Sequence, residues 1–183
     1  MQSRRLVIDA NILIRAVLGV RVRELIERYC ESAAFYVAES NVEEAMRYLA
    51  ELAPRRGILE EIWRESLSGI MAAVQIIPQA ELAAAEAEAM ARIGQRDPAD
   101  WPAIAGALQF DCPVWTEDED FFGSGVATWT TSTVEIYLRG ASPGAPSARL
   151  ARAPAFPCRH RLCQRGGERI QRLHAGKRDG QPQ

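Results

Sequence analysis

The sequence predicts an α/β domain with a mainly parallel central sheet, followed by a basic tail. Along residues 1–138, short apolar runs that suit buried strands are separated by segments whose apolar residues recur at helical spacing. Continuous aliphatic runs such as LVI (6–8) are typical of strands covered on both faces, as parallel strands are. Strands separated by helices in this way favour a sandwich of helices around a sheet.

Each element is predicted from its local pattern. The expected strands are RRLVID (4–9), AFYVA (34–38), VQIIP (74–78), CPVW (112–115) and VATWT (126–130). Asn11 is expected to cap a helix that runs to about Leu18. Ser40 or Asn41 is expected to cap another, with an apolar face of Val42, Ala45, Met46 and Leu49. Further helices are expected over 22–32, 58–73, 80–94, 97–108 and 131–138.

The charge is divided unevenly along the chain, although the formal net charge is only −2. Residues 1–138 contain 12 Arg, no Lys and 22 Asp and Glu, a net charge of −10. Residues 139–183 contain ten basic residues against Glu168 and Asp179, a net charge of +8. This second segment is rich in Gly, Pro, Ala and Arg and has no apolar period, so it buries too little surface to offset its ordering entropy. We therefore expect a folded domain over 1–138 and a flexible basic tail over 139–183.

The composition also limits the environment of the protein. No run approaches the roughly 20 apolar residues of a membrane span, and the N-terminus has no signal-peptide core. The cysteines are too scattered for a secreted disulfide framework, so we expect a cytoplasmic protein without membrane contact. In the tail, Cys158, Cys163 and His174 are too loosely spaced to favour a zinc site.

Asp9 raises the main functional question, because it directly follows the buried run LVI and an unpaired buried carboxylate is costly. Other acids occupy comparable places. Glu43 and Glu44 open one helix, Asp97 and Asp100 open another, and TEDED (116–120) follows a strand. In parallel α/β sheets, ligands bind beyond the carboxyl ends of the strands. One acid from each cluster is therefore expected to enter a shared pocket.

Carboxylates that share a pocket need a counter-charge, because they repel one another and some would otherwise be protonated. Mg²⁺ and Mn²⁺ prefer oxygen ligands and remove that repulsion. Such an ion can activate a water molecule and stabilise the charge that develops on a phosphate. The four clusters thus predict metal-dependent hydrolysis of phosphodiesters.

Structural alternatives exist for these acids. Asp9 alone could cap the helix that follows it. With Pro98 at the first helical position, Asp97 forms a good N-cap, and this interpretation is preferred for Asp97 over a metal ligand. Within TEDED, Asp118 is the preferred ligand, Asp120 ranks lower, and Glu117 and Glu119 are expected in solvent.

Four motifs together resemble the PIN-domain family, which includes the VapC-type toxin ribonucleases: VIDANILIRAVL, ESNVEEAMRYL, DPADWPAIAGAL and VWTEDEDFFGSGVATWTT. The resemblance covers about residues 4–138 and says nothing about the tail. It implies a three-layer α/β/α sandwich and endoribonuclease activity with Mg²⁺ or Mn²⁺. It also implies a small antitoxin partner and a homodimer.

Carried over by position, the resemblance assigns the acids of the pocket. Asp9 is the first and Asp118 the fourth. Glu44 is preferred over Glu43 as the second, and Asp100 over Asp97 as the third. Asn11 and Thr116 fall where the family places neutral polar residues that help to orient metal-bound water.

Other α/β enzyme classes fit the sequence less well. Haloacid-dehalogenase-type phosphatases, receiver domains and P-loop NTPases each need a functional lysine, and residues 1–138 contain none. The dinucleotide-binding GxGxxG pattern is also missing. The alternatives that remain are a non-catalytic RNA- or protein-binding module of the same fold and a solitary housekeeping nuclease.

Overall fold

The structure is a computed structural model, and it describes residues 4–140. A five-stranded sheet crosses the middle of the domain in the order β3-β2-β1-β4-β5, and every neighbouring pair is parallel. The strands are β1 (Arg4–Ile8), β2 (Ala33–Ala38), β3 (Val74–Ile77), β4 (Val114–Trp115) and β5 (Thr128–Trp129). The helices are α1 (Ala10–Leu18), α2 (Arg21–Tyr29), α3 (Glu39–Arg55), α4 (Glu60–Met71), α5 (Gln79–Leu82), α6 (Glu86–Ile93), α7 (Trp101–Phe110) and α8 (Val134–Arg139).

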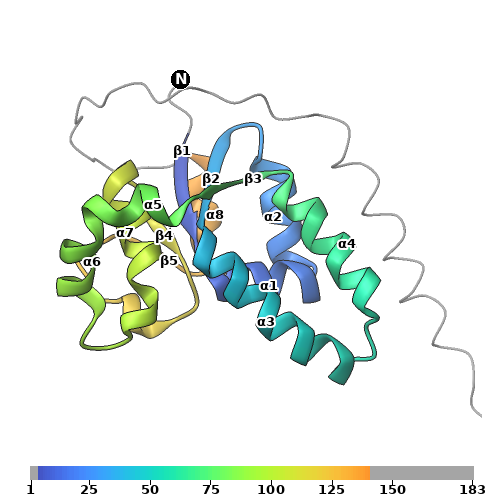
Figure 1. The fold of residues 1–183 in the computed structure, drawn as a ribbon. Coiled ribbons are helices and arrows are strands. Elements are labelled where there is room, and N and C mark those ends of the chain that lie inside the picture. The colour runs from blue at the N-terminus through green and yellow to red at the C-terminus, as the bar shows by residue number, and fades with distance from the viewer. Residues whose placement is uncertain (1–3, 141–183) are drawn as a thin grey trace, which may run out of the picture.

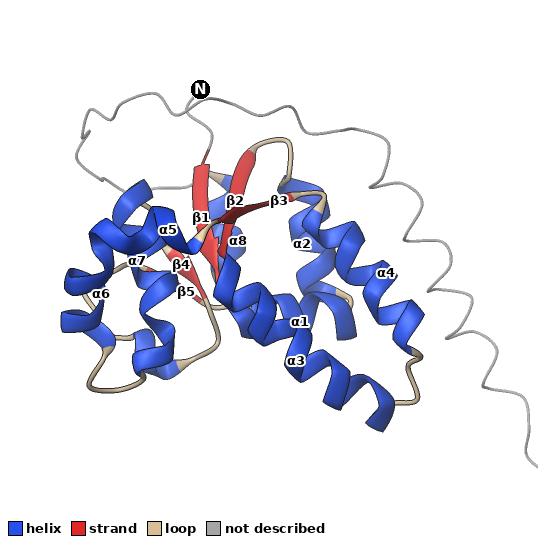
Figure 2. Ribbon diagram, in the orientation of Figure 1, coloured by secondary structure: helices blue, strands red, loops and turns tan. Residues whose placement is uncertain are grey.

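Helices cover both faces of the sheet, so the predicted three-layer α/β/α sandwich is confirmed. Helices α1 to α4 lie on one side of the strands, and α5 to α7 lie on the other (Figures 1 and 2). Because side chains alternate along a strand, Leu6 and Ile8 of β1 pack into the core under α1 to α4. Val7 packs into the core under α5 to α7. The continuous apolar run at 6–8 is explained by this burial on both faces.

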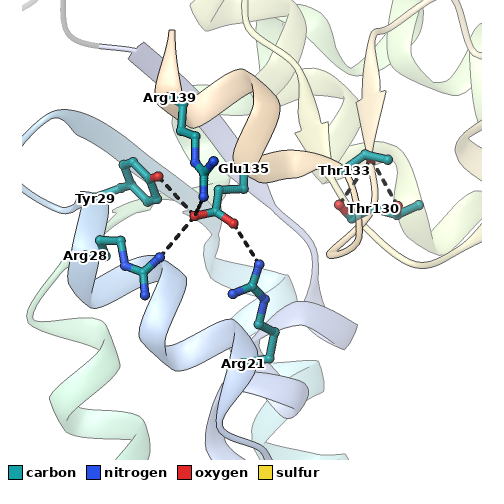
Figure 3. A network of polar contacts seen from close by, with 7 residues as sticks. All are labelled: Arg21, Arg28, Tyr29, Thr130, Thr133, Glu135 and Arg139. Carbon is teal, nitrogen blue, oxygen red and sulfur yellow. Dashed lines mark hydrogen bonds and ion pairs between the residues drawn. The ribbon is translucent and has the colours of Figure 1, made fainter. Parts of the chain in front are cut away.

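Helix α8 is tied to α2 by one carboxylate (Figure 3). Glu135 accepts hydrogen bonds from Arg21 and Arg28 at the two ends of α2, at 2.8 and 3.0 Å. It also accepts from Tyr29 at 3.2 Å and from Arg139 at 2.9 Å. The last helix of the described chain is thereby fixed to the helix layer.

The caps predicted for α1 and α3 were both wrong. The N-cap of α1 is Asp9 and not Asn11, because the Asp9 carboxylate accepts from the Ala10 amide. Helix α3 begins at Glu39 after Ala38, without a side-chain cap, because the amide of Asn41 points into the domain toward Asp9. Neither Ser40 nor Asn41 therefore caps it.

The helix expected over 80–94 is broken. It consists of α5, a 3₁₀ turn over Ala83–Ala85, and α6. Only alanines and glutamates lie between Leu82 and Ala89, so no large side chain anchors this stretch to the core. The helix expected from 97 likewise opens with a 3₁₀ turn, Pro98–Asp100, before α7.

No helix within residues 4–140 is both long enough and apolar enough to cross a membrane. The predicted basic tail lies outside the described residues except for Arg139 and Gly140, and so do Cys158, Cys163 and His174.

Candidate active site

The candidate site lies at the carboxyl edge of the sheet, where β1 and β4 are adjacent. Asp9 directly follows β1, and Thr116 directly follows β4. The Asp9 amide donates to the Trp115 carbonyl at 3.1 Å, so the pairing of the two strands continues to the edge of the site. This is the part of a parallel sheet where ligands are expected.

Asp9 is buried, with 4% of its surface exposed, and four donors surround its carboxylate. Oδ1 accepts from the Ala10 amide at 2.6 Å and from Asn41 Nδ2 at 3.1 Å. Oδ2 accepts from Asn11 Nδ2 and from the Thr116 hydroxyl, the latter at 2.7 Å. A carboxylate offers about four acceptor positions, so Asp9 is both the cap of α1 and the centre of a polar network.

Thr116 and Asn11 use nearly all of their hydrogen-bonding capacity within this network. The Thr116 hydroxyl donates to Asp9 and accepts from Asn11 Nδ2 at 3.0 Å and from the Asp118 amide at 2.9 Å. Asn11 Oδ1 accepts from the Glu117 amide at 3.2 Å. The two side chains therefore hold Asp9 and the start of the acidic turn in place, and their orientation of a water molecule stays a prediction.

Asn41 is a site residue that the sequence did not reveal. Its side chain is buried, with 2% exposed, and its amide reaches Asp9 from 32 positions away. From the sequence alone, Asn41 could be interpreted only as a helix cap. A polar residue near the start of an amphipathic helix gives the same sequence pattern whether its side chain caps the helix or points into the domain.

The electrostatics connect the four preferred acids. Burial is the main cause that raises the pKa of Asp9 to about 6. The hydrogen bonds from Thr116 and Ala10 lower this pKa, and the charges of Glu44 and Asp118 raise it. Burial raises the pKa of Asp100 to about 8, and the charges of Asp9, Asp97, Asp118 and Glu44 add to this effect. The pKa of Glu44 is also raised, mainly by burial. Acids that lie just before α1, on α3, in the 97–100 segment and in the turn after β4 thus contribute to these pKa values.

The lower-ranked acids occupy different places. Glu43 is exposed beside the half-buried Glu44. Asp97 is the N-cap of the 3₁₀ turn, as predicted, and accepts from the Ala99 amide at 2.7 Å.

The Asp120 amide donates to Asp118 Oδ1 at 2.9 Å. Glu117, expected in solvent, instead accepts from the Thr131 amide at 2.7 Å and holds the segment after β5.

The donor set fits a hard divalent cation. Asp100 Oδ2 is buried and has no hydrogen-bond partner, so no group within the described residues satisfies this oxygen. Burial and neighbouring acids raise the pKa values of Asp9 and Asp100, and a cation bound beside them would oppose this effect. Within residues 4–140 no three His, Cys, Asp or Glu side chains lie close enough together to enclose an ion. Mg²⁺ commonly keeps several water ligands and binds through one or two carboxylates, so the site suits an ion with few direct protein ligands.

The comparisons with known proteins agree with this fold. Residues 7–139 match the family described as PIN domain. No curated protein matches the chain. Among solved structures, the chain is similar to PAE2754 from Pyrobaculum aerophilum, with 15% identity and a TM-score of 0.57 over 76% of this chain and 92% of that one.

Two further solved structures are similar to the chain. VapBC2 from Rickettsia felis, bound to a DNA fragment from its promoter, has 12% identity and a TM-score of 0.55 over 69% of this chain and 98% of its matched chain. FitAcB from Neisseria gonorrhoeae has 23% identity and a TM-score of 0.53 over 69% of this chain and 98% of its matched chain. At these identities the likeness shows the fold alone.

Proposed function

Because the chain belongs to the PIN-domain family, whose members are typically nucleases, we propose that it is an endoribonuclease that hydrolyses RNA phosphodiester bonds with Mg²⁺ or Mn²⁺. One observation carries the proposal. At the carboxyl edge of the sheet, burial and the charges of acids from separate segments raise the pKa values of Asp9 and Asp100, and Asp100 Oδ2 is buried without a partner.

In this proposal Asp9, Glu44, Asp100 and Asp118 surround the ion, one or two of them in direct contact and the others through water ligands, and Glu43, Asp97 and Asp120 rank below them. When bound, the ion would supply a polarised water molecule and a counter-charge for the phosphate. Asn11, Asn41 and Thr116 keep the Asp9 carboxylate in one orientation. With a pKa of about 8, Asp100 carries a proton at neutral pH and would release it when a cation binds.

Replacement of each of the four acids by its amide tests the assignment. Asp9→Asn, Glu44→Gln, Asp100→Asn and Asp118→Asn should each abolish Mn²⁺-dependent cleavage of an RNA substrate, while the circular dichroism spectrum stays that of the wild type. The matched control is Glu119→Gln, because Glu119 is an exposed neighbour of Asp118, and Glu43→Gln tests the lower-ranked alternative to Glu44 and should keep its activity. Full activity of Asp9→Asn would overturn the proposal.

We further propose that the protein is the toxin of a toxin–antitoxin pair and acts as a homodimer with a small antitoxin partner. One similar structure is a toxin–antitoxin complex from Klebsiella pneumoniae, with a TM-score of 0.51. A pocket of carboxylates also attracts an arginine inserted by a partner, since guanidinium and carboxylate groups pair bidentately.

Expression of the chain alone in a bacterial host tests the toxin role. Growth arrest that disappears with Asp9→Asn is expected. Normal growth at high levels of an active enzyme would instead indicate a solitary housekeeping nuclease. RNA binding without cleavage in purified protein would indicate the non-catalytic module.

A further inference from the structure

Arg92 in the last turn of α6 and Arg96, three residues after its end, hold the turn that follows Asp118. Arg96 Nη1 donates to the carbonyl oxygens of Asp120 and Phe122, at 2.8 and 2.7 Å. Arg92 Nη1 donates to the carbonyl oxygen of Ser124 at 3.3 Å. Both guanidinium groups thus bind the backbone of the turn, and Arg96 makes the two shorter contacts.

Arg96 connects two of the segments that carry candidate ligands. Its own backbone is fixed to α6, because its amide donates to the Ile93 carbonyl at 2.8 Å and the Ile93 side chain is fully buried. The next residue is Asp97, and Asp100 follows one turn later. A single side chain therefore joins the 97–100 segment to the turn that begins at Asp118.

Two glycines of the turn lie directly against these arginines. Gly123 has a φ of +90°, and a Cβ on it would lie 2.9 Å from Arg96 Nη2. Gly125 has a φ of +78°, and its Cβ would lie 2.9 Å from Arg92 Nη1. A side chain at either position would be strained and would also push a guanidinium group away.

We propose that Arg96 is a positioning residue for the candidate metal site. By binding the carbonyl oxygens of Asp120 and Phe122, it limits the movement of the turn after Asp118 relative to the 97–100 segment, and with it changes in the separation of the Asp118 and Asp100 carboxylates. Metal–ligand distances tolerate only a few tenths of an ångström, so a turn that moves by more loses affinity. The inference rests on the proposed function, because it assumes that a cation binds at these acids.

Mn²⁺ binding provides the test, measured from the loss of the electron paramagnetic resonance signal of free Mn²⁺ as protein is added. Arg96→Ala should bind Mn²⁺ about tenfold more weakly than the wild type, since loss of a group that orients metal ligands costs about 10–100-fold in affinity. Arg96→Lys should recover part of the loss, because its ammonium group can still donate to a carbonyl. Arg64→Ala, which removes an exposed arginine paired with Glu60 on α4, should bind as the wild type does.

A second pair of variants tests the contact without removing Arg96. Gly123→Ala crowds its guanidinium, whereas Gly57→Ala imposes a similar positive φ of +69° where no heavy atom lies within 4 Å of the new Cβ. Only Gly123→Ala should weaken Mn²⁺ binding, even if both variants lower the melting temperature.

The outcomes separate this inference from the proposed function. Unchanged Mn²⁺ affinity in Arg96→Ala and in Gly123→Ala would overturn the positioning role, whatever happens to stability. A wild-type protein that binds no Mn²⁺ would overturn the proposed metal site itself, and the inference with it.

Discussion

At the scale of single residues, the Thr116 hydroxyl links two of the candidate acids, since it donates to Asp9 and accepts from the Asp118 amide. Both contacts are shielded from water, because Thr116 has no exposed surface. Loss of a buried partner leaves the remaining group unsatisfied, which costs more than an ordinary hydrogen bond contributes.

Thr116→Val should therefore lower the free energy of unfolding by about 2 kcal/mol, because it leaves the Asp118 amide without its acceptor. Urea denaturation monitored by circular dichroism measures this. The control is Thr128→Val, since the Thr128 hydroxyl donates only to the Val126 carbonyl and valine suits a strand. Equal losses in the two variants would contradict the argument.

Asp100 should make the metal-free protein less stable as the pH rises. The folded-state pKa of about 8 lies above the ordinary value of 3.8, so the folded state holds the proton more tightly than the unfolded state. The stability that this proton contributes is fully present below about pH 4 and is lost as the pH rises toward 8. The raised pKa of Asp9, about 6, acts in the same direction between about pH 4 and 6.

The melting temperature of wild type and of Asp100→Asn, measured with a chelator between pH 4 and 8, tests this. The wild type should lose stability with rising pH, and the variant should show a weaker dependence and be the more stable protein at pH 8. Glu119→Gln, at an exposed position, is expected to follow the wild type. Parallel curves for Asp100→Asn and wild type would show that burial of this carboxyl has no energetic consequence.

At the scale of elements, the contact between α2 and α8 depends on one carboxylate held by three arginines and a tyrosine (Figure 3). The hydrogen bonds from Arg139 and Arg21 lower the pKa of Glu135 to about 2. A lowered pKa means that the ionised form stabilises the fold above the ordinary value of 4.5, and that this contribution is lost as the pH falls toward 2.

Glu135→Gln should lower the melting temperature at pH 7, and the difference should shrink in 1 M salt and as the pH falls from about 4.5 to 2. Glu60→Gln is the matched control, because it breaks an exposed ion pair within α4 that joins no two elements. A loss for Glu135→Gln that persists at pH 2 would show that packing rather than charge connects the helices.

The accuracy of the sequence-based predictions also varied by element. The strand at 4–8 was predictable, because burial on both faces leaves a continuous apolar run. The roles of Asn11 and Asn41 were not predictable. Each side-chain amide donates a hydrogen bond to Asp9 and caps no helix, and only the tertiary fold brings Asn41 close to Asp9. Arg96 carried no signal, since its partner carbonyls lie 24 and 26 positions away and any residue type supplies a carbonyl.

At the scale of the whole molecule, residues 141–183 are outside the described chain, and the prediction for them rests on composition. Truncation after Gly140 should leave the melting temperature of the domain nearly unchanged, because this segment offers little apolar surface to bury. Differential scanning calorimetry of the two lengths measures this. A drop of several degrees would mean that the segment packs on the domain.

The central place of β1 in the sheet has a consequence for the timing of folding. β1 is the first strand of the chain, yet it pairs with β4, and Asp9 bonds with Thr116 across 107 positions. Closing so long a loop slows folding, and a chain emerging from the ribosome folds from its N-terminus. β1, β2 and β3 can therefore assemble while the candidate site still lacks Asp100, Thr116 and Asp118, so the site is complete only after most of the domain has been synthesised.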